Sequence, residues 1–174
     1  MHNSMLKKGL VALVATFGLA GGAWAQAPQL TSELQVQRVE TVDGQTVFKP
    51  AQTSKPGDVL EYRVSYTNHS KSAISGLVAN LPIPPGTTLV DRSAIPPDAF
   101  ASTDGAKFAP VPLMRVVKSA DGKEQRVLVP LEEYRELRWN LDTLPAGTTK
   151  QVQARVRVNE VPKAASAAPA QPAG

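Results

Sequence analysis

Apolar and polar residues alternate with a period of two in three segments of this chain. Within residues 59–67 the apolar Leu60, Tyr62, Val64 and Tyr66 alternate with the polar Glu61, Arg63, Ser65 and Thr67. Residues 150–159 alternate in the same way, and Trp139 shares its phase with Leu137 and Leu141. This pattern is typical of strands that turn one face to a core and the other face to water. It predicts three half-buried strands and a buried Trp139.

Turn-forming dipeptides separate the strand-like segments. Asp-Gly occurs at residues 43–44, 104–105 and 121–122, and it favours the type I′ hairpin, in which both central residues need a positive φ. No window of comparable length has a helical period, and the best helical candidate, residues 131–135 after Pro130, is long enough for one turn only. Short strands separated by such turns predict an all-β fold, an antiparallel β-sandwich. A parallel βαβ sheet is excluded, because no long helices lie between the strands.

The N-terminus has the three-part pattern of a secretory signal peptide. Lys7 and Lys8 precede an uncharged run over residues 10–22, and Ala23 and Ala25 place small residues at the cleavage site. The run is shorter than the roughly 20 apolar residues of a transmembrane helix. We expect cleavage after Ala25, no transmembrane anchor in the mature chain, and a periplasmic or extracellular location.

These patterns divide the chain into four parts. Residues 1–25 form the signal peptide, residues 26–32 a short polar lead-in, and residues 33–161 the β-sandwich domain. Residues 162–174 consist almost wholly of Ala, Pro, Ser and Gln, so a disordered Ala/Pro-rich C-terminal tail is predicted. A single domain of this length can bury a core without disulfides or a structural metal.

Composition excludes several kinds of chemistry. The 174 residues include no cysteine and two histidines, of which only His69 lies beyond the signal peptide. A thiol nucleophile, a disulfide framework and cysteine-ligated zinc are therefore excluded, and a histidine metal cluster or catalytic triad is not expected. Removal of Lys7 and Lys8 lowers the net charge from +4 to +2 (17 basic against 15 acidic residues), and no basic cluster interleaved with aromatic residues is present. We expect no cofactor, no metal and no nucleic-acid partner.

Two groups of residues resemble catalytic or modification sites, but a structural role explains each group better. Asn68, His69 and Ser70 match an N-x-S glycosylation pattern and place a histidine beside a hydroxyl. Catalytic triads are assembled from distant segments, so a turn is favoured here. The acids within residues 132–136 could be paired carboxylates for glycoside hydrolysis, but acids within one short turn are more often a solvated face. No catalytic residue is predicted.

The charges of greatest interest are Arg138, Arg155 and Arg157, each on the polar phase of a predicted strand. The short segment 144–149 joins the two strands, so a hairpin that places them side by side in one sheet is the simplest arrangement. The three arginines would then form an exposed basic stripe. Because guanidinium groups bind phosphate and carboxylate bidentately, these residues are candidate contacts for anionic envelope polymers. The alternative is an ordinary solvated face.

An ordered series of motifs over about residues 50–158 resembles a known family of bacterial exported domains. A Pro-Gly-Asp turn leads into a strand with an aromatic residue and an asparagine turn; a hydrophobic strand, a proline-rich turn, a tryptophan strand and a Leu-x-Ala-Gly turn into a valine strand follow. These motifs are Lys55-Pro56-Gly57-Asp58-Val59-Leu60-Glu61-Tyr62, Tyr66-Thr67-Asn68, Leu77-Val78, Ile83-Pro84-Pro85-Gly86-Thr87, Leu137-Arg138-Trp139, and Leu144-Pro145-Ala146-Gly147 before residues 152–158. The series resembles the conserved repeat domain, also known as domain of unknown function eleven, here in a single copy.

The resemblance implies an immunoglobulin-like β-sandwich in an exported or surface protein, with no established reaction and no catalytic residues. The chain departs from the family pattern at Ser70, where a glycine is frequent, and at Leu81, where an aspartate is frequent. No capping or ion-binding role of that aspartate therefore transfers to this chain.

Together these observations predict a non-catalytic exported β-sandwich that acts as an accessory or interaction module of the bacterial cell envelope. Its partner would be an envelope protein or polymer. The alternative is a periplasmic ligand-binding protein that uses the long connection over residues 95–130, because long loops on a rigid scaffold often carry function. A concave apolar pocket with convergent polar groups would favour the alternative. An enzyme is not expected.

Overall fold

The computed structural model describes residues 29–160. The predicted signal peptide, its cleavage site after Ala25 and the predicted tail over residues 162–174 lie outside the described residues. Within this range the chain is almost entirely β-structure, with eleven strands and one short 3₁₀ helix. The first strand begins at Leu30, three residues before the start predicted for the domain.

All three segments with alternating residues are strands, and the short helical turn lies where it was predicted. The elements in chain order are β1 (Leu30–Val42), β2 (Gln45–Pro50), β3 (Val59–Asn68), β4 (Ile74–Pro82), β5 (Thr87–Leu89), β6 (Phe100–Ser102), β7 (Ala109–Pro110), β8 (Met114–Lys118), β9 (Glu124–Leu128), the 3₁₀ helix η1 (Leu131–Glu133), β10 (Glu136–Leu144) and β11 (Thr149–Val158).

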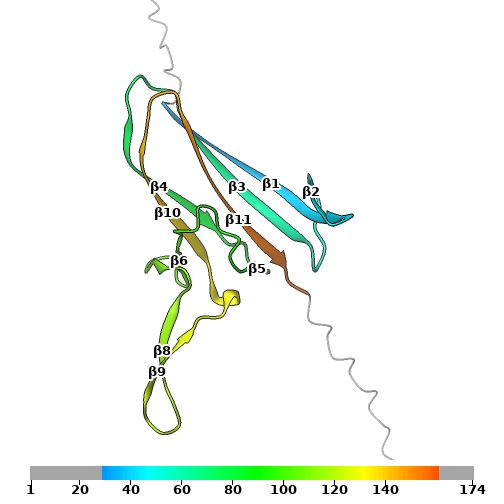
Figure 1. Ribbon diagram of the computed structural model, residues 1–174, viewed down its shortest axis with the longest axis vertical. Coiled ribbons are helices and arrows are strands. Elements are labelled where there is room, and N and C mark those ends of the chain that lie inside the picture. The colour runs from blue at the N-terminus through cyan, green and yellow to red at the C-terminus, as the bar shows by residue number, and fades with distance from the viewer. Residues whose placement is uncertain (1–28, 161–174) are drawn as a thin grey trace, which may run out of the picture.

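Two antiparallel sheets enclose one hydrophobic core, which confirms the predicted all-β, antiparallel architecture (Figure 1). The five-stranded sheet has the order β2-β1-β3-β11-β5, and the four-stranded sheet has the order β4-β10-β6-β7. Every strand pair in both sheets is antiparallel. The strands alternate between core and solvent as their sequences predict, because successive side chains of a strand point to opposite faces.

Trp139 on β10 lies at the centre of the core, as predicted. Its side chain is 1% exposed, and Leu137 and Leu144 of the same strand are fully buried. The indole Nε1 donates a 2.8 Å hydrogen bond to the carbonyl oxygen of Pro96, so the polar edge of the ring is also satisfied. From the other sheet, β11 contributes the buried Val152 to the same cluster.

The predicted hairpin between β10 and β11 is wrong. The two strands belong to different sheets, so the segment between Leu144 and Thr149 crosses from one sheet to the other. Asn68 at the end of β3 holds this crossing: its backbone N–H donates to Thr148, its carbonyl oxygen accepts from Gly147, and its side-chain amide donates to Leu144. A crossing between sheets lets both strands face the core with their apolar phases, as a hairpin would, so alternation alone does not distinguish the two.

The three Asp-Gly pairs all lie in turns between strands, but the aspartate does not have the same role in each turn. Asp43 and Gly44 both have positive φ (50° and 77°), as the predicted type I′ turn requires. Asp104 does not have a positive φ; its Oδ1 accepts 2.8 Å hydrogen bonds from the backbone N–H groups of Ala106 and Lys107. These hydrogen bonds, with one from the Ser102 hydroxyl, lower the pKa of the Asp104 carboxyl to about 2.

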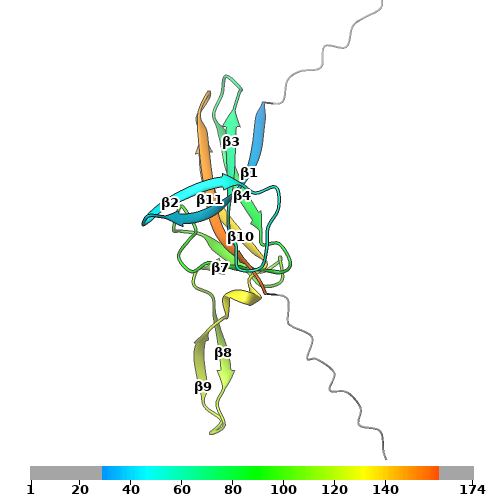
Figure 2. The same cartoon turned by 90° about the vertical axis from the view of Figure 1, so that its right-hand side faces the viewer.

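A third, two-stranded sheet projects away from the sandwich (Figures 1 and 2). It is the β8–β9 hairpin, and its base is fixed to the body by buried residues. Leu113 and Val129 are buried on either side of the base, and the Val129 N–H donates to the Leu113 carbonyl oxygen at 2.9 Å. The Leu113 N–H in turn donates to the hydroxyl of the buried Tyr134 at 2.7 Å. No helix among the described residues is long and apolar enough to cross a membrane.

Candidate functional site

The β8–β9 hairpin presents apolar side chains to solvent on one face. Met114 lies opposite Leu128 and Val116 lies opposite Arg126 in the antiparallel register, so all four side chains project to the same side. Met114, Val116 and Leu128 are 43%, 58% and 62% exposed. Isolated two-stranded hairpins are marginally stable in water, and these side chains add nothing to a core. Their exposure is therefore unexplained by folding.

A hollow of about 460 Å³ lies at the base of this hairpin. Most of its lining is apolar, and Leu128 belongs both to the hollow and to the exposed face of the hairpin. We call Met114, Val116, Leu128 and this hollow the apolar strip. The residues that line the hollow are Leu89, Val90, Asp91, Arg92, Ser93, Ala94, Pro97, Val111, Pro112, Leu128 and Leu131.

The wall of the hollow formed by residues 89–94 is held firmly against β11. The Ser93 hydroxyl donates to the carbonyl oxygens of Val90 and Arg155 and accepts from the Arg155 N–H. Just beyond, Ile95 and Gln153 exchange two backbone hydrogen bonds of 2.8 Å. Within this wall Arg92 has a φ of 53°, and its side chain is 91% exposed. The hollow is thus part of the rigid scaffold.

An ion pair also links the hairpin to the body. Arg115 on β8 donates two hydrogen bonds to the carboxylate of Glu133 in η1, at 2.7 and 3.0 Å. Both hydrogen bonds come from the one guanidinium nitrogen Nη1, and the two side chains are 46% and 41% exposed, so the ion pair adds only modestly to the fixing of the hairpin by Leu113 and Val129. Glu133 thus lies on a solvated face, as predicted, and also links the 3₁₀ helix to the hairpin.

A second hollow, of about 520 Å³, adjoins the first and shares Leu89, Val90 and Asp91 with it. Its lining carries three acids, Asp91, Glu132 and Glu160, against one base, Arg157. Neither Glu132 nor Glu160 forms an ion pair with another of the described residues. The surface beside the apolar strip is therefore acidic.

The predicted arginine stripe is not formed, because its members lie on different sheets. Arg138 is on β10 of the four-stranded sheet, where its Nε donates to Asn80 at 2.9 Å and its guanidinium lies 3.5 Å from the centre of the Phe108 ring. Arg155 and Arg157 are on β11 of the five-stranded sheet. Arg157 lines the acidic hollow, and Arg155 takes part in an internal ion pair.

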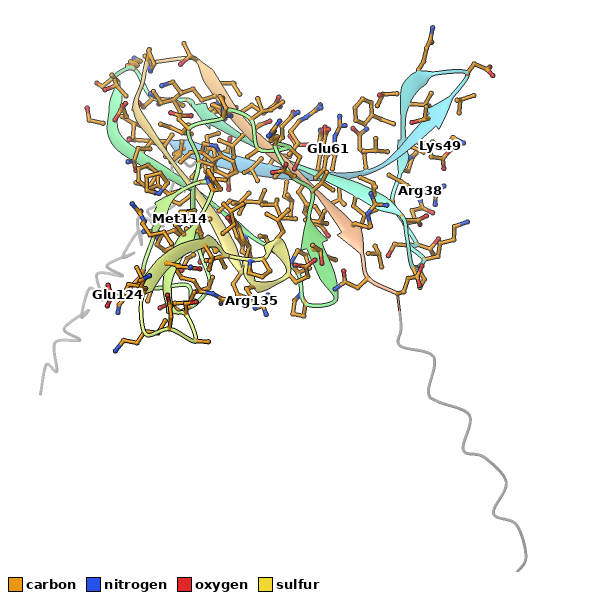
Figure 3. The ribbon with its side chains drawn as sticks, turned by 60° about the horizontal axis from the view of Figure 1, so that its bottom comes forward. Arg38, Lys49, Glu61, Met114, Glu124 and Arg135 are labelled. Atoms are coloured by element: carbon orange, nitrogen blue, oxygen red, sulfur yellow. The ribbon has the colours of Figure 1, made fainter. Side chains whose placement is uncertain are left out.

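That ion pair contains a buried acid that the sequence analysis did not single out. Glu61 is 1% exposed although it lies on the polar phase of β3. Its carboxylate accepts from Arg63 at 2.6 Å and from Arg155 at 3.0 Å, and the Phe48 ring lies about 6 Å from both guanidinium groups. Phe48 belongs to the β1–β2 hairpin, which stands beside Glu61 (Figure 3). The sequence signal that could have indicated this cluster is Phe48, the one aromatic residue of a largely polar hairpin.

The turn interpretation of Asn68, His69 and Ser70 agrees with the structure. Asn68 is fully buried, and its Nδ2 donates to the carbonyl oxygens of Ser72 and Leu144. Its Oδ1 accepts from the Ser70 N–H and hydroxyl, whereas the His69 ring contacts the Thr31 hydroxyl. The side chain of Asn68, rather than an unusual backbone conformation, builds this turn. Within residues 29–160 no three His, Asp or Glu residues are grouped as metal ligands.

Comparison with known proteins gives no further information on the site. No protein-family model, no curated protein and no solved structure matches this chain.

Proposed function

We propose that this protein is a non-catalytic, immunoglobulin-like β-sandwich that acts as an interaction module of the bacterial cell envelope, and that the apolar strip is its contact surface. The signal-peptide pattern at the N-terminus supports export. The resemblance to the conserved repeat domain supports the immunoglobulin-like topology and an accessory role. Both remain proposals that rest on the sequence.

One observation supports the apolar strip as the contact surface: the apolar side chains of the hairpin continue without interruption into an apolar hollow of the body. Single exposed apolar residues are normal on protein surfaces, but a contiguous apolar patch marks an interaction site. Met114 and Val116 occupy alternate positions of one strand, so the patch follows from the strand period. The hairpin is also tied to the body by Arg115, so the patch has a fixed shape.

A small-molecule ligand in the hollow is the second candidate. Its volume of about 460 Å³ lies within the range of ligand pockets. Such pockets also need polar groups that converge on the ligand, and here the supply is poor: the Ser93 hydroxyl is used within the wall, and Asp91 and Arg92 are 70% and 91% exposed. The lining therefore favours a protein partner over a small ligand. Anionic polymers are also less favoured, because Arg155 is already paired with Glu61.

Site-specific photo-crosslinking in the producing cells tests the proposal. A photoreactive amino acid at Val116 of the full-length chain should give crosslinked protein adducts in the envelope fraction. The same amino acid at Val78 is the matched control, because that valine is 43% exposed on the four-stranded sheet, away from the apolar strip. Adducts at Val116 and not at Val78 support the proposal. Equal yields at both sites, or no adduct at either, contradict it, as does recovery of the protein only from the cytoplasm.

A further inference from the structure

We propose that the partner on the apolar strip is a second copy of this chain, and that two copies dock reciprocally, each hairpin against the hollow of the other. The inference rests on the proposed function in one respect, that the apolar strip binds protein.

A projection and a hollow lie on the same side of the molecule, at the two ends of one strip. Leu128 lines the hollow, Met114 lies opposite Leu128, and Val116 is two residues further toward the tip. A two-fold axis across the middle of the strip would bring Val116 of each copy to the hollow of the other. An interface of this kind is self-complementary and closes as a dimer, because the same patch is used twice.

The hairpin cannot fill the hollow of its own chain. Its strands lead away from the sandwich and do not fold back over it (Figures 1 and 2). The base is fixed by the hydrogen bonds of Leu113 with Val129 and Tyr134, and Arg115 of β8 also pairs with Glu133 of η1. The side chains of Met114 and Val116 can therefore enter such a hollow only on another molecule.

The charges of the two surfaces are opposite in sign. Residues 114–128 carry four basic and two acidic side chains, a net charge of +2. In the docking hollow Asp91 is paired with Arg92 at 3.6 Å, so the negative charge lies on the adjoining hollow, where Glu132 and Glu160 stand against Arg157, a net charge of −1. Arg126 lies opposite Val116 on the same face of the hairpin, so it would reach the acidic rim as Val116 enters the hollow. Complementary charge sets the orientation of such contacts and disfavours wrong partners.

Sedimentation equilibrium of the mature chain tests the inference. We expect the weight-average mass to rise with concentration from that of the monomer toward twice that value, because dimerisation follows mass action. Val116→Lys should raise the dissociation constant of the dimer at least about tenfold, since it places a charge in the apolar contact. Val78→Lys is the matched control and should leave the dissociation constant unchanged. Circular dichroism and the thermal midpoint show that each variant is folded.

A charge swap provides a second, independent measurement. Arg126→Glu alone should weaken dimerisation, and Glu132→Arg in addition should restore it in part, because Glu132 lies on the acidic rim that Arg126 would reach and has no ion-pair partner among the described residues. A wild-type mass that stays monomeric at every concentration overturns the inference, as does a dimer that Val116→Lys leaves intact. If the protein is monomeric but Val116 crosslinks to a different protein in cells, the inference fails while the proposed function stands.

Discussion

The sandwich and the β8–β9 hairpin differ in where they place their apolar side chains. In the sandwich these side chains are buried: Leu137 and Trp139 of β10 are at most 1% exposed. In the hairpin Met114, Val116 and Leu128 face water on one side of the ribbon, and Val116 is 58% exposed. The two hairpins differ as well, since Phe48 of the β1–β2 hairpin lies about 6 Å from the guanidinium groups of Arg63 and Arg155, the partners of Glu61, whereas the β8–β9 hairpin leads away from the sandwich (Figures 1 and 3). The burial of apolar side chains in the first region is explained by folding, and their exposure in the second region points to binding.

The largest effect is expected for Trp139→Ala. Removing a fully buried indole leaves a cavity between the sheets and an unpaired carbonyl oxygen on Pro96, so the free energy of unfolding should fall by about 3–5 kcal/mol. Chemical denaturation followed by circular dichroism measures this change. A midpoint close to that of the wild type would show that the core does not depend on Trp139, and the contrast with the hairpin would lose its basis.

Asn68→Ala comes next in size. The substitution removes the acceptor of the Ser70 N–H and the donor for the carbonyl oxygens of Ser72 and Leu144, which lie where the chain crosses between sheets. Leaving such groups unpaired should lower the free energy of unfolding by about 2–3 kcal/mol. Ser70→Ala, which keeps both Nδ2 hydrogen bonds, is the control and should cost less. Equal losses in both variants would show that Asn68 does not hold the crossing.

Glu61→Gln should destabilise the protein less, by about 1–2 kcal/mol. The carboxylate is buried, but Arg63 and Arg155 are 29% and 35% exposed, so water compensates part of the lost ion pairs. Arg157→Gln is the control, because Arg157 forms no ion pair with another described residue. A loss no greater than that of the control would show that the ion pairs of Glu61 do not contribute to stability.

The Asp104 turn predicts a pH dependence that is smaller still. The pKa of Asp104 lies at about 2 in the folded protein, below the value of 3.8 of the free group. Its contribution to stability is therefore present above about pH 4 and is lost as the pH falls toward 2. The stability difference between the wild type and Asp104→Asn should shrink over this interval when thermal midpoints are compared. A difference that is constant with pH would contradict the role of the ionised carboxylate.

The smallest effect on stability is expected at the hairpin. Val116→Lys should change the free energy of unfolding of the monomer by less than about 0.5 kcal/mol, because Val116 contributes nothing to the core. Thermal unfolding at a concentration where the protein is monomeric measures this. A large loss would show that the hairpin is part of the folding unit, and that its apolar face needs no partner to explain it.

The fold was predictable in its elements but not in all of its pairings. The alternation over β3, β10 and β11 identified these strands and the burial of Trp139. It did not identify which strands share a sheet, because the period of two defines the phase of a strand and not its neighbour. The crossing between β10 and β11 depends on the buried Asn68, and sequence alone does not show that its side chain binds Leu144.

The candidate site was predictable in part. The connection over residues 95–130 was expected to carry function in the alternative interpretation, and it supplies Pro97, Val111, Pro112 and Leu128 to the hollow. The opposite wall, residues 89–94, was not anticipated, because its position depends on long-range contacts with β11. The burial of Glu61 was missed for the same reason: its partner Arg155 is 94 residues away, and Phe48 comes from a separate hairpin.

The turn of the β8–β9 hairpin divides the chain into two parts, and each sheet of the sandwich takes strands from both parts. Everything before it supplies β3, β4 and β6, and everything after it supplies β10, which pairs with β4 and β6, and β11, which pairs with β3. Residues 120–123 of the turn are exposed and far from the core (Figure 2). Two fragments separated within it would each lack central strands of both sheets and would fold only by combining. The hairpin is thus a natural position for a split reporter, or for the insertion of a second domain.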